Sequence, residues 1–252
     1  MYRTVLLALA LLGLSNAPAL AAAITVDQIL YASGSDPSKL SGTVDMTLSG
    51  NTLTIILTNT SLDAAGSGAG ILLTGIGFQL PTGIGIGTGS GAAINTGSSG
   101  VGFSGTGGTS VSQEWGYDSG TLKSGLFTAT GSLGYNIVVS SMESQVTNQF
   151  AAGSIAQPPN LDGPDFGLVS ALETGALGSG VEGIRDSIVI TLVLTGSVPS
   201  NLLSSIESGN VGLSFGSPDS FYRRTQVPEP SSLLFLSGAV LAGVGYFRRR
   251  DA

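Results

Sequence analysis

The chain contains no cysteine and no histidine, and only 10% of its 252 residues are charged. Without cysteine there is no disulfide, no thiol nucleophile and no thiolate metal site. Without histidine there is no Ser-His pair of the kind that activates a hydrolytic serine. Carboxylates are therefore the only abundant acid–base groups in the chain.

Basic side chains are scarce as well, with 9 lysines and arginines against 16 aspartates and glutamates. Residues 24–227 hold five of the basic residues and fourteen of the acidic ones. An acidic stretch with few, scattered cations presents no surface that matches a phosphate backbone. We therefore expect no nucleic acid partner.

The first 23 residues have the three parts of a secretory signal peptide. A basic residue near the start is followed by an apolar run over residues 5–14 and then by an alanine-rich stretch. The run is too short to cross a bilayer, which takes roughly 20 apolar residues. Ala21 and Ala23 fit the −3 and −1 positions of a cleavage site, so we predict a mature chain that begins at Ile24. Cleavage after Ala21 is the alternative.

The C-terminus has a proline-containing motif, an apolar stretch and a basic end, in that order. The motif consists of Val227, Pro228, Glu229 and Pro230. Its two prolines keep the backbone extended, a shape that a processing enzyme can grip. The apolar residues 233–247 predict a transmembrane helix of about 22 Å, at about 1.5 Å per residue. The basic end, which holds this terminus in the cytoplasm, consists of Arg248, Arg249 and Arg250.

This order of features closely resembles the PEP-CTERM sorting domain, from residue 227 to the end of the chain. The resemblance implies recognition by an exosortase, a membrane transpeptidase-like enzyme, in Gram-negative bacteria that make extracellular polysaccharide. It also implies that Pro228, Glu229 and Pro230 are the recognition residues. On the same analogy, the helix and the arginines are removed after a transient stay in the inner membrane. A plain membrane anchor is the competing interpretation of this segment.

Residues 24–226 predict an all-β exported domain. The runs 42–48 and 52–58 alternate apolar and polar residues and are joined by Ser-Gly-Asn, which predicts a β-hairpin. Its apolar face comprises Val44, Met46, Leu48, Leu53, Ile55 and Leu57. Further strands are expected at residues 24–31, 71–80, 126–130, 136–140, 166–170, 186–195 and 211–215. Many short strands separated by turn residues favour an antiparallel β-sandwich or a jelly-roll-like domain.

Helix is expected only in short pieces, at residues 199–206 with Gly209 as the stop, and at residues 141–150. Residues 66–108 contain 16 of the 39 glycines. This Gly-rich stretch is either a long mobile loop or a set of Gly-rich turns laid over the sheet.

Two groups of carboxylates are candidate binding sites. Asp162 and Asp165 flank a Gly-Pro turn, where they can ligate calcium or simply form the turn. Glu114 and Asp118 lie beside Trp115, the only tryptophan, which predicts either a sugar-stacking patch or an aromatic packed at a sheet edge. A glycosidase needs only two carboxyls brought together in space, and the sequence singles out no such pair.

Four matches to three known sequence patterns are expected to be accidental. Ser214 lies in Gly-Leu-Ser-Phe-Gly, which matches a nucleophile elbow, but it sits in an alternating strand and the chain has no histidine. Two Gly-x-Gly-x-x-Gly matches begin at Gly100 and Gly178 without the strand–loop–helix setting of a dinucleotide site. Asn59 opens a glycosylation sequon that we expect to be a strand end.

We therefore predict no catalytic, cofactor-binding or metal-ligating residue, no enzyme activity and no cofactor. The leading hypothesis is an exported structural or adhesive component of the cell surface, extracellular matrix or biofilm. A carbohydrate- or calcium-binding module is the second hypothesis and a glycosidase the third. The expected partners are signal peptidase and exosortase during export, the inner membrane transiently, and extracellular polysaccharide.

Overall fold

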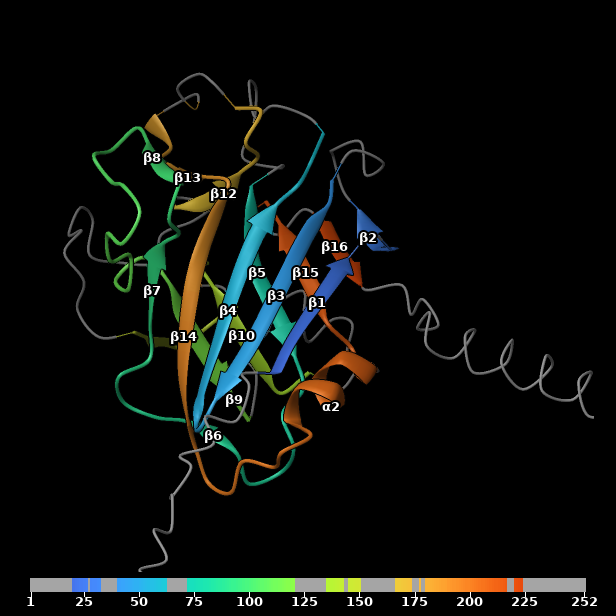
Figure 1. Cartoon of the computed structure of the whole chain (residues 1–252). Coiled ribbons are helices and arrows are strands. Elements are labelled where there is room, and N and C mark those ends of the chain that lie inside the picture. The colour runs from blue at the N-terminus through green and yellow to red at the C-terminus, as the bar shows by residue number, and fades with distance from the viewer. Residues whose placement is uncertain are drawn as a thin grey trace, which may run out of the picture.

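Two β-sheets packed face to face make up the domain, as a computed structural model shows (Figure 1). The structure describes residues 20–26, 28–32, 40–62, 72–120, 135–142, 145–150, 166–173, 177, 180–216 and 220–223. The predicted all-β sandwich is confirmed. Most of the predicted signal peptide, the strand at 126–130 and the whole C-terminal sorting segment lie outside the described residues.

Six of the described strands form the first sheet, termed sheet A. Its members are β1 (Leu20–Val26), β3 (Gly42–Ser49), β4 (Thr52–Asn59), β14 (Ser187–Thr195), β6 (Gly85–Ile86) and β7 (Gly91–Ile94). They pair in the order β1-β3-β4-β14, and the far side of β14 carries both β6 and β7. All of these pairs are antiparallel. The strand β1 therefore forms one edge of sheet A.

Ten described strands form the second sheet, termed sheet B. They are β2 (Gln28–Ala32), β5 (Leu73–Phe78), β8 (Ser99–Val101), β9 (Gly116–Ser119), β10 (Ile137–Ser140), β11 (Asn148–Gln149), β12 (Gly167–Val169), β13 (Gly183–Arg185), β15 (Gly212–Phe215) and β16 (Ser220–Arg223). The main path runs β11-β9-β10-β5-β12-β13-β8, while β15 joins β5 to β16 and β16 pairs with β2. The pair β12–β13 is parallel, so sheet B is mixed.

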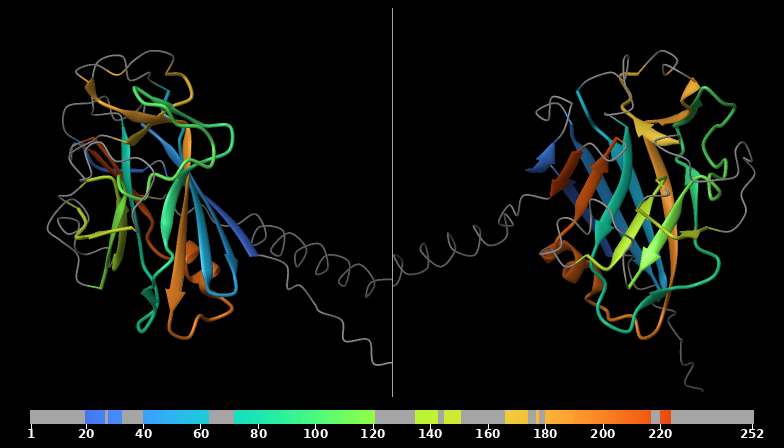
Figure 2. Two further views of the ribbon diagram at one scale, coloured as in Figure 1. Left: turned by 90° about the vertical axis from the view of Figure 1, so that its left-hand side faces the viewer. Right: turned by 180° about the vertical axis from the view of Figure 1, so that it is seen from behind.

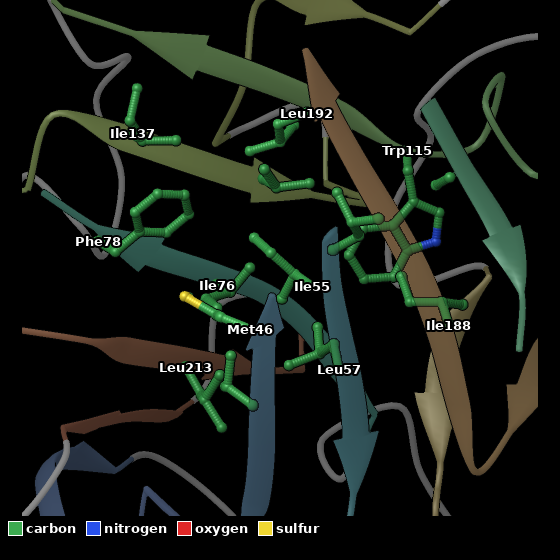
Figure 3. Packing of buried hydrophobic residues seen from close by; sticks show 14 of the residues in the cluster. Met46, Ile55, Leu57, Ile76, Phe78, Trp115, Ile137, Ile188, Leu192 and Leu213 are labelled. Atoms are coloured by element: carbon green, nitrogen blue, oxygen red, sulfur yellow. The ribbon is translucent and has the colours of Figure 1, made fainter. Parts of the chain in front are cut away.

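The hydrophobic core lies between the two sheets (Figures 2 and 3). Successive residues of a strand point to opposite sides, so every second side chain of β3 and β4 enters the core. Val44, Met46, Leu53, Ile55 and Leu57 are buried as predicted, and Leu48 packs against the same core. Sheet B contributes apolar side chains to the same core, including Ile76, Phe78, Ile137 and Leu213.

The predicted hairpin between β3 and β4 is confirmed. Ser49 pairs with Thr52, which leaves Gly50 and Asn51 as a two-residue loop. Gly50 has a φ of 57°, a left-handed conformation that glycine adopts without steric penalty. The short loop fixes the register, and the register places the polar residues of both strands on the side away from the core.

The chain passes from sheet B to sheet A at a single residue, Asp186, between β13 and β14. Its φ of 74° lies in the left-handed region, which aspartate adopts more readily than most residues with a Cβ. The carboxylate of Asp186 accepts hydrogen bonds from Ser187 Oγ at 3.1 Å and Ser98 Oγ at 3.5 Å. These hydrogen bonds stabilise the connection between β13 and β14 at Asp186.

Two of the local predictions need correction. Residues 141–150 were expected to be helical, but their described part contains β11 and turns, because Met142, Val146 and Phe150 pack against the rest of the domain. The single strand expected at 24–31 divides into β1 and β2, which belong to different sheets. The other expected helix is confirmed as α2 (Leu202–Ser208), followed by Gly209.

The Gly-rich stretch resolves, over residues 72–108, into β5 to β8 joined by tight turns. Gly83 and Gly97 take φ values of 89° and 90° in two of these turns. This part of the stretch is therefore not a long loop, and its Gly-rich turns connect strands that belong to the two sheets instead of lying over the sheet.

Candidate functional site

Trp115 belongs to the core and is 0% exposed. Its Nε1 donates a hydrogen bond of 3.1 Å to the backbone oxygen of Phe166, and its ring lies against the strands of sheet A (Figure 3). Glu114 and Asp118 are buried beside it, and Asp118 Oδ1 accepts a hydrogen bond of 2.9 Å from the backbone N–H of Thr147. The sugar-stacking interpretation of this segment is wrong, because no ring face of Trp115 reaches the surface.

Ser214 also lies in the interior, as a member of β15 that is 0% exposed. Its Oγ is 3.1 Å from Gln145 Oε1 and 3.3 Å from Thr74 Oγ1. The side chain is therefore part of a buried hydrogen-bond cluster. This agrees with the prediction that the nucleophile-elbow pattern is accidental.

The Gly-x-Gly-x-x-Gly match that begins at Gly100 has a packing role. A Cβ at Gly100 would lie 2.9 Å from the ring of Phe103, and one at Gly105 would lie 2.6 Å from it. The two glycines thus leave room for this ring, which packs on Phe166 with centroids 4.8 Å apart. The second match includes Gly178, which lies outside the described residues.

Asn59 ends β4 and is only 1% exposed. Its Nδ2, the atom that a glycan would modify, donates a hydrogen bond of 2.6 Å to the backbone oxygen of Leu168. Asn59 is therefore a structural strand end, as predicted. The candidate calcium ligands Asp162 and Asp165 lie outside the described residues, and the described part of the chain gathers no group of three or more metal-ligating side chains.

The outer side of sheet A is the candidate site, and sequence reasoning missed it. From Thr43 to Ser49 in β3, Thr52 to Thr58 in β4 and Val189 to Val193 in β14, the side chains on this side are partly or fully exposed, and this part of the sheet faces the viewer in Figure 1. We term this surface the hydroxyl face. It consists of Thr43, Asp45, Thr47, Ser49, Thr52, Thr54, Ile56, Thr58, Val189, Thr191 and Val193.

The strand register arranges the hydroxyl face in rows. Thr54 pairs with Thr47 on one side and with Thr191 on the other, so three threonines stand side by side across three strands. The next row is formed by Asp45, Ile56 and Val189. Neighbouring positions lie about 4.8 Å apart across the strands and about 6.7 Å apart along them. The result is a regular lattice of hydroxyl and methyl groups.

The hydroxyl face is nearly uncharged. Among its described residues, Asp45 carries the single carboxylate and none is basic. Seven of its eleven side chains carry a hydroxyl group, which both donates and accepts hydrogen bonds. The methyl groups of the same threonines, with Ile56 and the valines, add apolar area between the hydroxyls. Such a surface can hydrogen-bond a neutral polyhydroxy compound while packing against its C–H groups.

The outer side of sheet B is different, because other parts of the chain cover it. All six residues of β5 are buried, which includes the side that faces away from the core. There Ser140 Oγ donates to the backbone oxygen of Thr74 at 2.7 Å and lies 2.8 Å from Gln145 Oε1. These polar groups of sheet B therefore form hydrogen bonds within the domain and are not exposed to a ligand.

Comparison with known families identifies the C-terminal segment. Residues 226–250 match the family model of the PEP-CTERM protein-sorting motif, which confirms the predicted sorting motif. The match indicates an exported protein that is sorted by an exosortase. No curated protein and no solved structure matches the chain.

The matched segment includes the predicted transmembrane helix at residues 233–247, which lies outside the described residues. Within the described ranges, no helix combines the length and apolar character that crossing a bilayer requires.

Proposed function

We propose that this protein is a non-catalytic structural or adhesive component of the cell surface or extracellular matrix, and that it associates with neutral extracellular polysaccharide through the hydroxyl face. The observation that supports this function is the exposed lattice of threonines on β3, β4 and β14. The sorting motif at residues 226–250 supports a destination outside the cell.

The composition of the hydroxyl face favours a neutral glycan over a charged one. A polyanion such as alginate would meet the carboxylate of Asp45 and an acidic domain, and it would find no cation on the face. A neutral polysaccharide presents alternating hydroxyl and C–H groups, which suit threonine hydroxyls and methyls respectively. Each contact is weak, but a long polymer and many copies of the protein give high avidity.

Binding to an insoluble neutral glucan tests the proposal. We expect the mature protein to cosediment with microcrystalline cellulose and not with calcium alginate beads. Thr54→Lys places a long side chain at the centre of the hydroxyl face and is expected to lower the association constant roughly tenfold, which corresponds to about 1.4 kcal/mol.

The matched control is Thr106→Lys, which adds the same charge at an exposed loop position away from the hydroxyl face. It is expected to bind like the unmodified protein. Equal binding by the Thr54→Lys and Thr106→Lys variants would contradict the proposed site. Release of reducing sugar from the bound glucan would contradict the non-catalytic assignment.

A further inference from the structure

The edge strand β1 spans the predicted signal-peptide cleavage site. Leu20 pairs with Leu48, Ala23 pairs with Asp45 and Ile24 pairs with Val44 in one regular antiparallel register. If the mature chain begins at Ile24, four of the seven residues of β1 are removed. The backbone of β3 then has no described partner from Asp45 to Leu48 on that side.

We propose that this open stretch of β3 pairs, in the mature protein, with the same stretch of a second copy of the chain. The proposal rests on the export that the proposed function assumes, since export removes Leu20–Ala23. An unpaired strand edge is a ready template for another extended strand, because its N–H and C=O groups already point outward in register. In the described structure the edge is filled by an antiparallel strand, so a strand of this direction is known to fit there.

The residues of this edge lack the sequence features that usually block such pairing, and α2 lies beside the edge in contact with both β1 and β3. Between Asp45 and Ser49 there is no proline and no lysine, and the β1–β3 register contains no bulge. Asp45 is the one charged side chain in this stretch. The backbone is also held straight from the other side, because every residue from Gly42 to Ser49 pairs with β4.

The alternation of β3 limits the self-pairing registers, and an axis at Thr47 is the one centred on the stretch from Asp45 to Ser49, which has no partner in the shortened β1. In an antiparallel pair of strands, the side chains of two paired residues point to the same face of the sheet. The two-fold axis that relates two copies of β3 must therefore lie at the level of one residue and not midway between two successive residues. With the axis at Thr47, Met46 opposes Leu48 of the second copy and Asp45 opposes Ser49 of the second copy. The two Asp45 carboxylates then stand apart instead of facing each other.

This pairing has a consequence for the hydroxyl face. A two-fold axis perpendicular to the sheet keeps the outer sides of both copies on the same side. The Thr47–Thr54–Thr191 row of one copy would continue through Thr47 into the row of the second copy. The dimer therefore doubles the width of the surface that the proposed function assigns to polysaccharide.

Two chains that differ by four residues test the proposal. Both end at Pro230, and one begins at Ile24 whereas the other begins at Leu20 and keeps the whole of β1. Both contain every buried hydrophobic residue among those whose burial the structure describes, because these residues run from Leu40 to Phe215. Sedimentation velocity at up to roughly 100 μM should show a dimer for the Ile24 chain and a monomer for the Leu20 chain. A monomeric Ile24 chain, or dimers of both, would overturn the proposal.

A pair of variants of the Ile24 chain locates the interface. Thr47→Lys places two ammonium groups beside the two-fold axis and is expected to weaken the dimer roughly tenfold or more. Thr54→Lys makes the same change one strand further from the edge and should leave the dimer intact while it weakens polysaccharide binding. Equal dimerisation of both variants, with circular dichroism like that of the unmodified chain, would contradict this interface.

The intact mass of the protein from its native host completes the test without any polysaccharide. A chain that begins at Ile24 supports the proposal. A chain that begins at Ala22 leaves only Thr47 and Leu48 open, which is too short for the pairing, and one that begins at or before Leu20 leaves no open edge. Either of these two results overturns the dimer proposal while the function of the hydroxyl face is still tested separately by cosedimentation.

Discussion

Thr54 on sheet A and Ser214 on sheet B are both hydroxyl side chains that point away from the hydrophobic core of the sandwich. Thr54 is partly exposed and belongs to an open lattice, whereas Ser214 is 0% exposed and lies 3.1 Å from Gln145 Oε1. A hydroxyl side chain on sheet A can therefore contact a ligand, whereas a hydroxyl side chain on sheet B forms hydrogen bonds inside the domain. What distinguishes them is whether another segment of the chain covers the sheet.

Substitution of Gly75, on the covered sheet B, is expected to have the largest effect on stability. A Cβ at Gly75 would lie 2.8 Å from Ser214 Oγ, 2.9 Å from Gln145 Oε1 and 3.0 Å from Ser140 Oγ. We expect Gly75→Ala to lower the free energy of unfolding by about 2–3 kcal/mol, because the methyl group overpacks a buried polar cluster. Urea denaturation measures this loss.

The double variant Gly75→Ala/Ser214→Ala checks the cause of that loss. It removes the hydroxyl nearest to the new methyl group, so its destabilisation should be smaller than the sum of the two single changes. Strict additivity would show that the crowding around Ser214 is not responsible.

The same substitution on the two sheets should have unequal effects on stability. Ser140→Ala removes the hydroxyl that donates to the Thr74 carbonyl and accepts from the Met142 N–H at 3.0 Å. We expect a loss of about 1–2 kcal/mol, because buried polar groups lose a partner. Ser49→Ala on the exposed end of β3 should stay within about 0.5 kcal/mol. Similar thermal or urea unfolding of the two variants would refute the contrast.

Thr191→Val tests whether a hydroxyl group on sheet A contributes to polysaccharide binding and not to stability. The substitution keeps the shape of the side chain and removes one hydroxyl from the central row of the hydroxyl face. We expect unchanged stability and a roughly two- to tenfold weaker binding to cellulose, as one hydrogen bond of about 0.5–1.5 kcal/mol is lost. Unchanged affinity in a binding isotherm would mean that the row does not contact the glycan.

The smallest effect is expected from salt. Because Asp45 is the one charged residue of the hydroxyl face, ionic strength has little to screen there. Raising the salt concentration tenfold should change cellulose binding by less than roughly twofold. A steep loss of binding would point to a charged surface elsewhere on the molecule.

The sequence predicts the elements whose pattern is local. The alternation in β3 and β4, the Gly50 turn and the stop of α2 at Gly209 all depend on neighbouring residues, and all are confirmed. The sorting motif is likewise a contiguous pattern, and the family match confirms it. Periodicity and turn chemistry act within a few residues, so they are visible without a structure.

Features that depend on distant contacts were not predicted. The short strands β7, β9 and β13 are strands because of their pairing, and β5 pairs with β15, about 140 residues away in the chain. Trp115 is buried because Phe166 and the core surround it. The threonines of the hydroxyl face were visible as residue types, but only the packing of the domain shows that sheet A, and not sheet B, is left uncovered.

The position of β16 determines how this domain would carry a mechanical load. The sorting motif begins three residues after Arg223, the last residue of β16. A pull on the chain at that end acts along β16, which is hydrogen-bonded to β15 on one side and to β2 on the other. Antiparallel hydrogen bonds run perpendicular to the strands, so such a pull shears both ladders together. The strand next to the sorting motif is thus an interior strand, and β2 shields it from being peeled away as an edge strand would be.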